Sequence, residues 1–452
     1  MDLKDKRVLV VGLGKSGVAS ALFLKERGAR VTVSDTKPPE QLRDEIPLLL
    51  DHGIAVETGG HGERTFRGQD LIVVSPGVPV DAPPLIQARA LGEPVIGEIE
   101  LAAQNLSGTI VAITGSNGKT TTTTLAGEIL AAGGLPVAVG GNIGTPAISL
   151  VQQASRETIT VLEVSSFQLE TIQTFRPKIA VILNITPDHL DRHRTFHAYV
   201  DAKARIFENQ QASDFAVLNE DDSTCRTLGD RTRAQVVWFS RKKEVQRGAY
   251  VHDGQIFFRD AGGQREIMQV SEIPLKGAHN VENVLAGVCA GALMGCAPEK
   301  IQQAIRNFKA VEHRLEYVAT IKGVEYFNDS KATNVDATIK ALESFPKNVH
   351  LILGGKDKGS DYTVLNDLLR ERVKRVYTIG AAAEKIESQI KGAAQIVHAE
   401  TLENAVRRAS AVAQAGDIVL LAPACASFDQ FQSYNHRGRV FKEVVSALAT
   451  ER

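Results

Sequence analysis

The chain contains few cysteines and has no excess of charge of either sign. Only four of its 452 residues are cysteines, and they stand at positions 225, 289, 296 and 425. No two of them form a C-x-x-C pair, which excludes a cysteine-rich zinc site or a redox motif, so we expect four reduced thiols in the core.

Long apolar runs and clusters of basic residues are also missing. No stretch approaches the roughly 18 apolar residues of a membrane-spanning helix, and the N-terminus has no signal-peptide pattern. The 52 basic and 53 acidic residues give a formal net charge of -1, unlike the basic stripe of a nucleic-acid-binding protein. We therefore expect a cytoplasmic protein with no membrane or nucleic-acid partner, whose anionic ligands are met by local sites.

The chain is long enough for about three domains of ordinary size. Short β-branched runs alternate with helical patterns in three parts of the chain: the first hundred residues, the part that begins at about residue 109, and the part after about residue 349. This alternation is typical of parallel α/β sheets. Residues 249–252 and 255–258 flank an Asp-Gly pair and predict an antiparallel hairpin added to the central domain. We place the domains at residues 1–97, 98–307 and 308–452.

The strongest motif is the run TGSNGKTT at residues 114–121. It follows an apolar stretch at residues 109–113 and opens a helical pattern, as a phosphate-binding loop does. Glycines there let N–H groups face a phosphate, Lys119 reaches the outer phosphates, and the Thr120 hydroxyl suits Mg²⁺. The first glycine of the usual pattern would fall at Ile113, so the loop is a shortened variant, and a chance glycine turn is the alternative.

A second glycine pattern, GLGKSG at residues 12–17, follows the first predicted strand. With Asp35 at the end of the next strand, it matches a dinucleotide-binding fingerprint and on its own indicates an NAD-dependent dehydrogenase. A nucleoside diphosphate sugar satisfies the same chemistry, and the separate triphosphate loop favours that interpretation. The turn Ser75-Pro76-Gly77 either adds N–H groups for the same anion or is a plain turn.

Glu163 ends one predicted strand of the central sheet, and His189 follows another. Ligands gather beyond the carboxyl ends of parallel strands, so these two side chains are candidates for a shared Mg²⁺ site. Magnesium prefers oxygen, and a turn histidine is the alternative for His189. Lys203 lies in a helical pattern over residues 196–208 and is either a surface lysine or, if it approaches the metal, chemically neutralised, because a bare ammonium would be repelled.

His279 and Asn283 are four residues apart and share one face of a predicted helix. This polar pair suits hydrogen bonds to a nucleotide. An N-terminal capping role for His279 or Asn280 is the alternative.

Taken together, these motifs resemble the Mur ligases, the ATP-dependent enzymes that add amino acids to the peptidoglycan precursor. The resemblance extends over the whole chain and includes the shortened phosphate loop, GGNIG at 140–144, EVSSFQL at 163–169 and Asp188-His189. The runs NDSKATN at 328–334, Gly354-Gly355 through Lys358, and PACASFDQF at 423–431 resemble the D-glutamate-adding branch. The fold implied has an N-terminal Rossmann-like UDP-binding domain, a central P-loop ATPase-like domain and a C-terminal Rossmann-like domain.

The resemblance also implies roles for individual residues. The expected UDP-substrate site comprises Gly14, Lys15, Ser16, Gly17, Asp35, Thr36, Ser75, Pro76 and Gly77, with Asn142 and His189 at the muramoyl part. The expected ATP site comprises Gly115, Ser116, Asn117, Gly118, Lys119, Thr120, Thr121, Asn283, Arg314 and Asp329. The expected D-glutamate site comprises His313, Thr333, Lys358, Ser427 and Phe428. Two magnesium ions are expected near Thr120, Glu163, His189 and Lys203, and the family carbamylates the lysine that matches Lys203. Lys119, Glu163, His189 and Lys203 are the implied catalytic residues.

The implied reaction is ATP-dependent amide formation through an acyl phosphate, in the synthesis of the cell-wall precursor and hence in growth and division. The expected partners are ATP, the UDP-muramoyl substrate and D-glutamate, and a self-contained three-domain chain favours a monomer. The alternatives are a folylpolyglutamate synthetase-like ligase and a nucleotide-gated binding protein without ligase activity.

Overall fold

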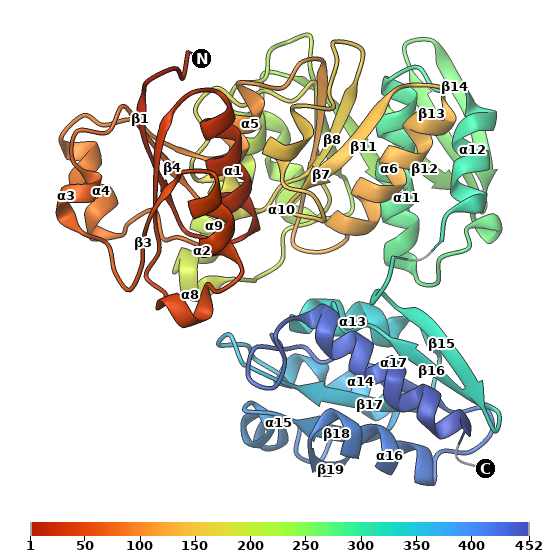
Figure 1. The fold of residues 1–452 in the computed structure, drawn as a ribbon. Coiled ribbons are helices and arrows are strands. Elements are labelled where there is room, and N and C mark those ends of the chain that lie inside the picture. The colour runs from red at the N-terminus through yellow and green to blue at the C-terminus, as the bar shows by residue number, and fades with distance from the viewer. Residues whose placement is uncertain (1, 310, 451–452) are drawn as a thin grey trace. The chain divides into compact units, whose positions relative to one another are not determined.

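The computed structural model describes residues 2–309 and 311–450, which divide into two compact units (Figure 1). The first unit comprises the chain up to residue 185 together with residues 197–270 and 284–305, and the second comprises residues 186–196, 271–283 and the chain from residue 306 onward. Two sheets belong to the first unit and a third to the second. The expected α/β class with three sheets is confirmed.

The first sheet has five strands in the order β3-β2-β1-β4-β5, and every pair is parallel. Its central strands β1 and β4 read RVLVV and LIVV and are buried almost throughout, as strands covered on both faces are. The strands are β1 (Arg7–Val11), β2 (Arg30–Ser34), β3 (Ala55–Glu57), β4 (Leu71–Val74) and β5 (Val95–Gly97). The helices are α1 (Lys15–Glu26), α2 (Glu45–Asp51), α3 (Glu63–Phe66), α4 (Pro83–Ala90) and α5 (Glu98–Ala103).

Helix α1 packs directly against the loop that precedes it. A Cβ atom built on Gly17 would lie 1.8 Å from the Gly12 carbonyl oxygen and 2.7 Å from Ser75 Oγ. Only a glycine fits at this position. Gly14 differs, because nothing lies within 4 Å of a Cβ built there.

The second sheet has nine strands in the order β14-β13-β12-β11-β10-β9-β6-β8-β7. Its strands are parallel from β7 through β12, while β12, β13 and β14 pair antiparallel, which confirms the predicted hairpin. The strands are β6 (Thr109–Thr114), β7 (Val137–Gly141), β8 (Ile159–Glu163), β9 (Ile179–Ile182), β10 (Phe215–Asn219), β11 (Gln235–Ser240), β12 (Gly248–His252), β13 (Gln255–Asp260) and β14 (Gly263–Gln269). The helices along this part of the chain are α6 (Lys119–Ala132), α7 (Ser166–Leu169), α8 (Leu190–His193), α9 (Phe196–Ala204), α10 (Ser223–Thr227), α11 (Ala278–Leu293) and α12 (Pro298–Asn307).

Two buried carboxylates on α5 connect the first sheet to loops of the second. Glu100 accepts hydrogen bonds from the backbone N–H groups of Gln173, Thr174 and Phe175, at 2.8 to 3.0 Å. Burial acts to raise the pKa of Glu100, but hydrogen bonds from Gln173, Thr174 and Gln104 outweigh it, so the pKa is lowered. The carboxylate of Glu100 therefore fixes the loop that leads into β9.

Glu98 holds a different loop. Its Oε1 accepts a 2.8 Å hydrogen bond from the N–H of Ile148, and the residue is 1% exposed. Its Oε2 is buried without a hydrogen-bond partner, and burial raises the pKa of Glu98 to about 7. A neutral carboxyl group fits this site better than a charged one.

The third sheet has six strands in the order β15-β16-β20-β17-β18-β19. We predicted a parallel sheet here, but β15 pairs antiparallel with β16, so the sheet is mixed. The strands are β15 (Glu316–Ile321), β16 (Val324–Asn328), β17 (Val349–Gly354), β18 (Val373–Ile379), β19 (Gln395–Glu400) and β20 (Ile418–Leu421). The helices are α13 (Val335–Glu343), α14 (Asn366–Arg372), α15 (Ala383–Gln389), α16 (Leu402–Val412) and α17 (Tyr434–Thr450).

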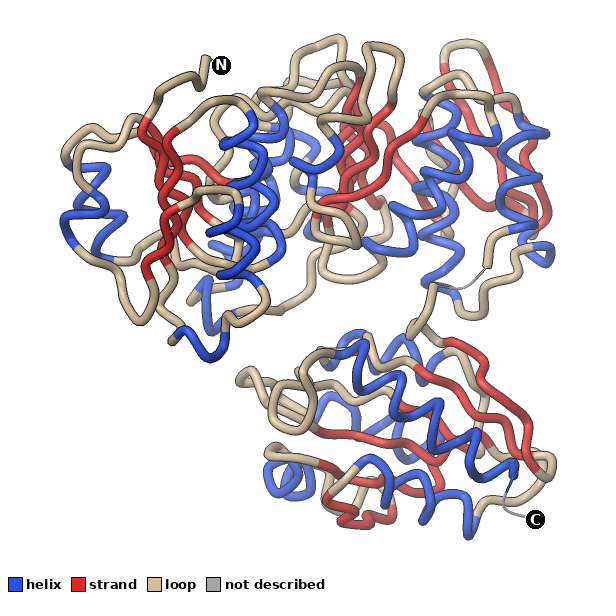
Figure 2. The backbone as a smooth tube through the Cα atoms, in the orientation of Figure 1, coloured by secondary structure: helices blue, strands red, loops and turns tan. Residues whose placement is uncertain are grey.

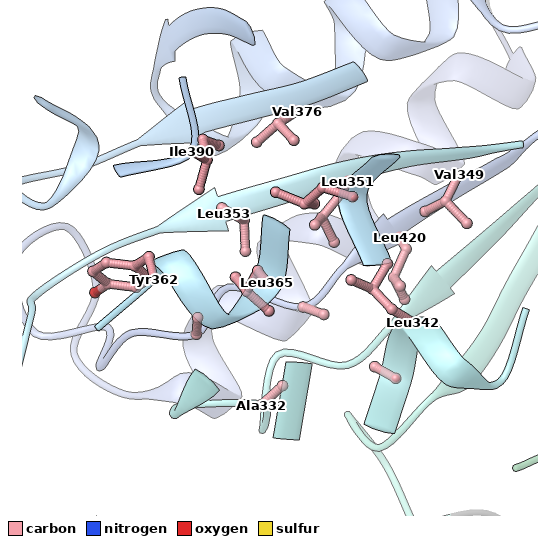
Figure 3. Close-up of a cluster of buried hydrophobic side chains, with 14 of the residues drawn as sticks. Ala332, Leu342, Val349, Leu351, Leu353, Tyr362, Leu365, Val376, Ile390 and Leu420 are labelled. Atoms are coloured by element: carbon pink, nitrogen blue, oxygen red, sulfur yellow. The ribbon is translucent and has the colours of Figure 1, made fainter. Parts of the chain in front are cut away.

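Helices cover both faces of this third sheet (Figure 2). On one face, Leu351 and Leu353 of β17 pack with Leu342 of α13 and with Leu365 (Figure 3). On the other, Ile352 packs in a cluster with side chains of α16 and α17. The carboxyl ends of β16, β20 and β17 are thereby held side by side.

All four cysteines are free and buried, as predicted. Within residues 2–309 and 311–450, every helix is too short or too polar to cross a bilayer.

Candidate active site

The shortened phosphate loop joins β6 to α6. Gly118, the residue before the helix, has φ of +84°, a conformation that favours glycine. Lys119 Nζ donates hydrogen bonds of 2.9 Å to the carbonyl oxygens of Gly115 and Ser116, so the ammonium group lies over the loop. A strand, a loop of this kind and a helix N-terminus form a site for phosphate groups.

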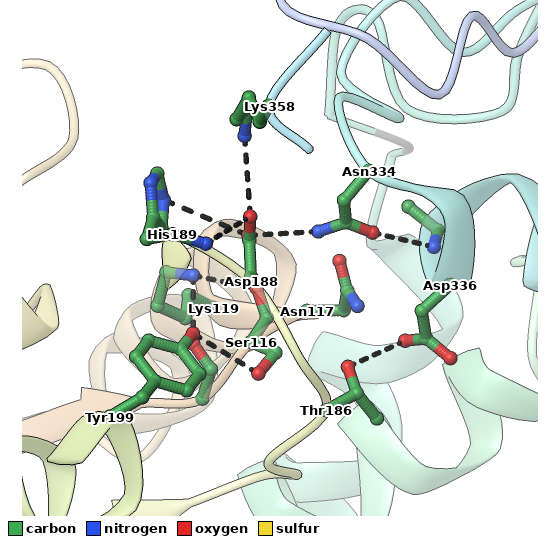
Figure 4. A network of polar contacts seen from close by, with 12 residues as sticks. Ser116, Asn117, Lys119, Thr186, Asp188, His189, Tyr199, Asn334, Asp336 and Lys358 are labelled. Atoms are coloured by element: carbon green, nitrogen blue, oxygen red, sulfur yellow. Dashed lines mark hydrogen bonds and ion pairs between the residues drawn. The ribbon is translucent and has the colours of Figure 1, made fainter. Parts of the chain in front are cut away.

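Neighbouring segments hold the loop in place. Asn184, just after β9, accepts a 2.9 Å hydrogen bond from the N–H of Asn117 and donates one of 3.1 Å to its carbonyl oxygen. Ser116 Oγ lies 3.1 Å from the hydroxyl oxygen of Tyr199 on α9 (Figure 4). The loop is therefore held by side chains from two other segments of the chain.

Glu163 ends β8 next to this loop. Its Oε2 accepts a 2.7 Å hydrogen bond from Thr120 Oγ1, and its Oε1 accepts one of 2.9 Å from the amide of Asn142. Glu163 is 1% exposed, whereas Asn142 is exposed. The structure thus brings together three residues that the sequence placed in the metal and substrate sites.

Lys203 is buried rather than on the surface, so the surface alternative for this residue is wrong. It is 1% exposed, and its Nζ lies 4.7 Å from the centroid of the Tyr199 ring. The same nitrogen donates hydrogen bonds to Gly115 O at 2.8 Å and to Thr114 Oγ1 at 3.4 Å. Lys203 therefore lies beside the phosphate loop.

The residues around the loop fit a magnesium ion. Thr120 and Glu163 supply a hydroxyl and a carboxylate at one buried point, and oxygen ligands of this kind suit a hard cation. The amine of Lys203 does not fit as a ligand in its charged form, whereas an oxygen anion built on it would.

The glycine loop of the first sheet is held by Asp35 and Ser75. The N–H of Leu13 donates a 2.6 Å hydrogen bond to Asp35 Oδ2, and Ser75 Oγ donates one of 2.8 Å to the Gly12 carbonyl oxygen. Both side chains are 7% exposed, while Gly14, Lys15, Thr36 and Gly77 are exposed. In the structure Asp35 orders the loop itself, a role that the fingerprint did not indicate.

In the second unit, Asp188 lies among several of the predicted residues. Its Oδ2 accepts a 3.0 Å hydrogen bond from the amide of Asn334, and its Oδ1 lies 3.3 Å from Lys358 Nζ (Figure 4). His189, which follows it, has φ of +53°, and its Nε2 lies 3.7 Å from Asp188 Oδ2. The predicted residues His189 and Lys358 therefore share one carboxylate partner.

His313, Arg314 and Asp329 come together before and after the β15-β16 hairpin. His313 is 2% exposed, its Nδ1 lies 2.9 Å from the amide nitrogen of Asn328, and burial lowers its pKa. Burial raises the pKa of Asp329 to about 6, and the neighbouring guanidinium group of Arg314 acts in the opposite direction.

Two predicted residues in the loop after β20, Ser427 and Phe428, differ in their exposure to solvent. Ser427 is 2% exposed, but Phe428 is 69% exposed and is the most open large apolar side chain among the described residues. We did not predict Tyr434. The centroid of its ring lies 3.8 Å from Lys331 Nζ and 6.4 Å from the centroid of the His313 ring, which it meets edge-on. The only signal for Tyr434 in the sequence was its place a few residues after the PACASFDQF run.

The pair His279 and Asn283 lies on α11, as predicted. Asn283 is 4% exposed and donates a 3.0 Å hydrogen bond to Asn280 Oδ1. His279 and Asn280 lie inside the first turn of the helix, so neither precedes it as a capping residue does. Burial lowers the pKa of His279 to about 4, which keeps the ring neutral at pH 7.

Family models match most of the chain in three consecutive parts. Residues 6–97 match "Mur ligase MurD-like, N-terminal domain", residues 113–291 match "Mur ligase middle domain", and residues 313–425 match "Mur ligase, glutamate ligase domain".

Whole-length relatives agree with these matches. A protein of Koribacter versatilis named "UDP-N-acetylmuramoylalanine--D-glutamate ligase" is 68% identical over 100% of this chain and 99% of its own length. A protein of Acidobacterium capsulatum with the same name is 59% identical over 99% of this chain and 97% of its own. The solved structure of a pseudomurein peptide ligase type C from Methanothermus fervidus shares the fold, with a TM-score of 0.63 at 20% identity over 98% of this chain and 100% of that one. The chain therefore belongs to the Mur ligase family of ATP-dependent ligases.

Proposed function

We propose that the chain joins D-glutamate to UDP-N-acetylmuramoyl-L-alanine at the expense of ATP, in the synthesis of the peptidoglycan precursor. The choice of substrates is supported by relatives with that printed name at 68% and 59% identity over essentially the whole chain. The observation that carries the chemistry is the buried contact of Thr120 with Glu163 beside Lys119 and the phosphate loop.

The first step activates a carboxylate. An oxygen of the substrate's terminal carboxylate attacks the γ-phosphorus of ATP, the bond from that phosphorus to the bridging oxygen breaks, and ADP leaves. Lys119 and the N–H groups of the loop offset the charge on the transferring phosphoryl group. The ATP site would comprise Gly115, Ser116, Asn117, Gly118, Lys119, Thr120, Thr121, Asn283, Arg314 and Asp329.

The second step forms the amide bond. The amine nitrogen of D-glutamate attacks the acyl carbon, loses a proton, and the tetrahedral intermediate expels phosphate. His313, Thr333, Lys358, Ser427 and Phe428 would hold D-glutamate, with cationic Lys358 matched to its carboxylates.

Magnesium would be held by Thr120 and Glu163, with His189 and a modified Lys203 completing the site for two ions. Bound there, the cation would neutralise negative charge on the phosphate oxygens. The Lys203 amine, when neutral, would attack the carbon of CO₂ and lose one proton, which leaves a carbamate whose oxygens suit the metal. Its burial beside the loop supports this assignment.

The UDP-linked substrate would lie along the glycine loop of the first sheet. Its site would comprise Gly14, Lys15, Ser16, Gly17, Asp35, Thr36, Ser75, Pro76 and Gly77, with Asn142 and His189 at the muramoyl part. The hydrogen bond between Asn142 and Glu163 supports a direct connection between this substrate and the metal site.

We propose domain boundaries after residues 97 and 307, a monomer in solution, and action in the cytoplasm, where ATP and UDP-linked precursors are made.

A substrate panel tests this function. Purified protein with ATP, Mg²⁺ and UDP-N-acetylmuramoyl-L-alanine should release ADP with D-glutamate, and at least 100-fold more slowly with L-glutamate, D-aspartate or L-lysine. Turnover with another amino acid, or with a pterin substrate, would overturn the proposed substrates. Nucleotide turnover that no amino acid affects would indicate a binding protein instead.

A further inference from the structure

Arg437, near the start of α17, is the largest fully buried side chain among the described residues. It is 1% exposed, and all its hydrogen bonds go to loops of the third sheet. Nε donates to Ser330 Oγ at 3.0 Å and Nη2 to the Ser330 carbonyl oxygen at 2.8 Å. Nη1 donates to the carbonyl oxygen of Cys425 at 3.1 Å.

The guanidinium group is thus bound by uncharged acceptors. Burial lowers the pKa of Arg437 to about 10, against the attraction of the nearby Asp429 and Asp329. A buried cation without a hydrogen-bonded carboxylate is costly, and apolar side chains would fill the same volume at lower cost. Such a group needs an explanation beyond packing.

The acceptors lie on loops that follow adjacent strands. Ser330 follows β16 and Cys425 follows β20, and the two strands pair in parallel. A Cβ built on Gly355, after β17, would lie 3.2 Å from Arg437 Nη1, so a third loop borders the same group. These loops carry Asp329, Thr333, Lys358 and Ser427.

Gly438, the next residue of α17, packs against His313, which is another residue of the proposed amino-acid site. A Cβ built on Gly438 would lie 2.3 Å from His313 Nδ1, and the Gly438 carbonyl oxygen accepts a 3.3 Å hydrogen bond from Asn328. The start of α17 therefore contacts each of the segments that carry the proposed amino-acid site.

We propose that Arg437 is a positioning residue: its hydrogen bonds join the loop after β16 to the loop after β20, it borders the loop after β17 at Gly355, and it thereby sets the spacing of the three loops for a dicarboxylic amino acid. This inference rests on the proposed function. Arg437 does not touch the substrate in this scheme. Its planar fork acts through Ser330 and Cys425, and a lysine, with a single nitrogen, reaches only some of these acceptors.

The test compares Arg437→Lys with Arg439→Lys, an exposed arginine on the same helix. Arg437→Lys should raise the KM for the amino acid at least tenfold and leave the KM for the UDP-linked substrate within about twofold. Arg439→Lys should change neither. The amino acid used is whichever one the wild-type enzyme joins, so a failure of D-glutamate as substrate does not count against Arg437.

A second variant guards against a folding defect. Ser330→Ala removes one acceptor and should raise the same KM, and the double variant should show less than the product of the two single effects, because both changes break one connection. Independent, multiplicative effects, or an unchanged amino-acid KM in well-folded Arg437→Lys or Ser330→Ala protein, would overturn the proposal.

Discussion

Thr120 Oγ1 donates a 2.7 Å hydrogen bond to Glu163 Oε2 and so joins the first turn of α6 to the end of β8. The two oxygens come from residues 43 positions apart in the chain. Both side chains are buried, so their relative position is set by the sheet rather than by solvent-exposed rotamers.

The hydroxyl of Thr120 should therefore be essential where its methyl group is not. Thr120→Val keeps the shape but removes the hydroxyl oxygen, and we expect kcat to fall by about 100-fold or more. Thr120→Ser keeps the oxygen and should retain activity within a few-fold. Steady-state ADP release across a magnesium series measures both, and equal activity of the two variants would contradict the assignment.

Lys203 should respond to chemical rescue. Lys203→Ala should lose most activity and regain part of it when acetate or formate is added, because a small carboxylate can occupy the space of the carbamate. Lys203→Arg, which cannot be carbamylated and stays cationic, should be inactive with or without the added acid. Rescue of both variants, or no loss in either, would exclude a carbamate at this position.

We expect Glu98 to make the unfolding free energy of the protein depend on pH. Its pKa in the folded chain is about 7, above the ordinary 4.5, so its contribution to stability is present below pH 4.5 and is lost as the pH rises through 7. Glu98→Gln cannot ionise and keeps an oxygen for the Ile148 N–H group. Relative to wild type, the variant should gain up to roughly 3 kcal/mol in unfolding free energy between those pH values.

Urea denaturation at a series of pH values measures this difference. A difference that does not change with pH would show that Glu98 does not titrate in this range. Glu40→Gln, at an exposed position, serves as a control and should show no such trend.

Alanine substitutions at Gly17 and Gly14 form a matched pair whose effects on stability we expect to differ. Gly17→Ala forces a methyl group to within 1.8 Å of the Gly12 carbonyl oxygen, and we expect a loss on the order of 3 kcal/mol or more. Gly14→Ala meets no atom within 4 Å and has an ordinary φ of -75°, so stability should change little. Thermal unfolding of both variants checks this, and similar midpoints would contradict the close packing of α1.

Phe428 offers a direct test of the D-glutamate site. Because its ring is 69% exposed, Phe428→Ala should leave the unfolding midpoint unchanged. If the ring holds the amino acid, the KM for D-glutamate should rise about tenfold. An unchanged KM would remove Phe428 from the site and leave Tyr434, which lies against His313, as the aromatic side chain to test next.

The sequence was most informative where chemistry and local structure coincide. Glycine patterns marked the glycine loop of the first sheet and the phosphate-type loop of the second, and continuous β-branched runs marked the buried parallel strands such as β4 and β8. These signals depend on residues within a few positions of one another, so they can be recognised from the sequence alone.

The residues that sequence reasoning missed depend on distant partners. Arg437 reaches Ser330 across 107 positions, and Glu100 reaches Phe175 across 75. The edge strand β15, which has no fully buried residue, lacks the continuous apolar run by which the other strands were recognised. The burial of Lys203 was likewise hidden, because it depends on Tyr199 and the loop folding around a side chain that is usually exposed.

Glu100 has a consequence for how the first sheet is joined to the second. Its helix begins at the end of β5, and its carboxylate accepts hydrogen bonds from three successive N–H groups before β9. Because one carboxylate accepts all three bonds, the position of α5 and the position of the segment that enters β9 are set together. Since Asn184, after β9, fixes the backbone of Asn117, a single acidic side chain ties the helix that follows the first sheet to a strand whose carboxyl end supports the shortened phosphate loop.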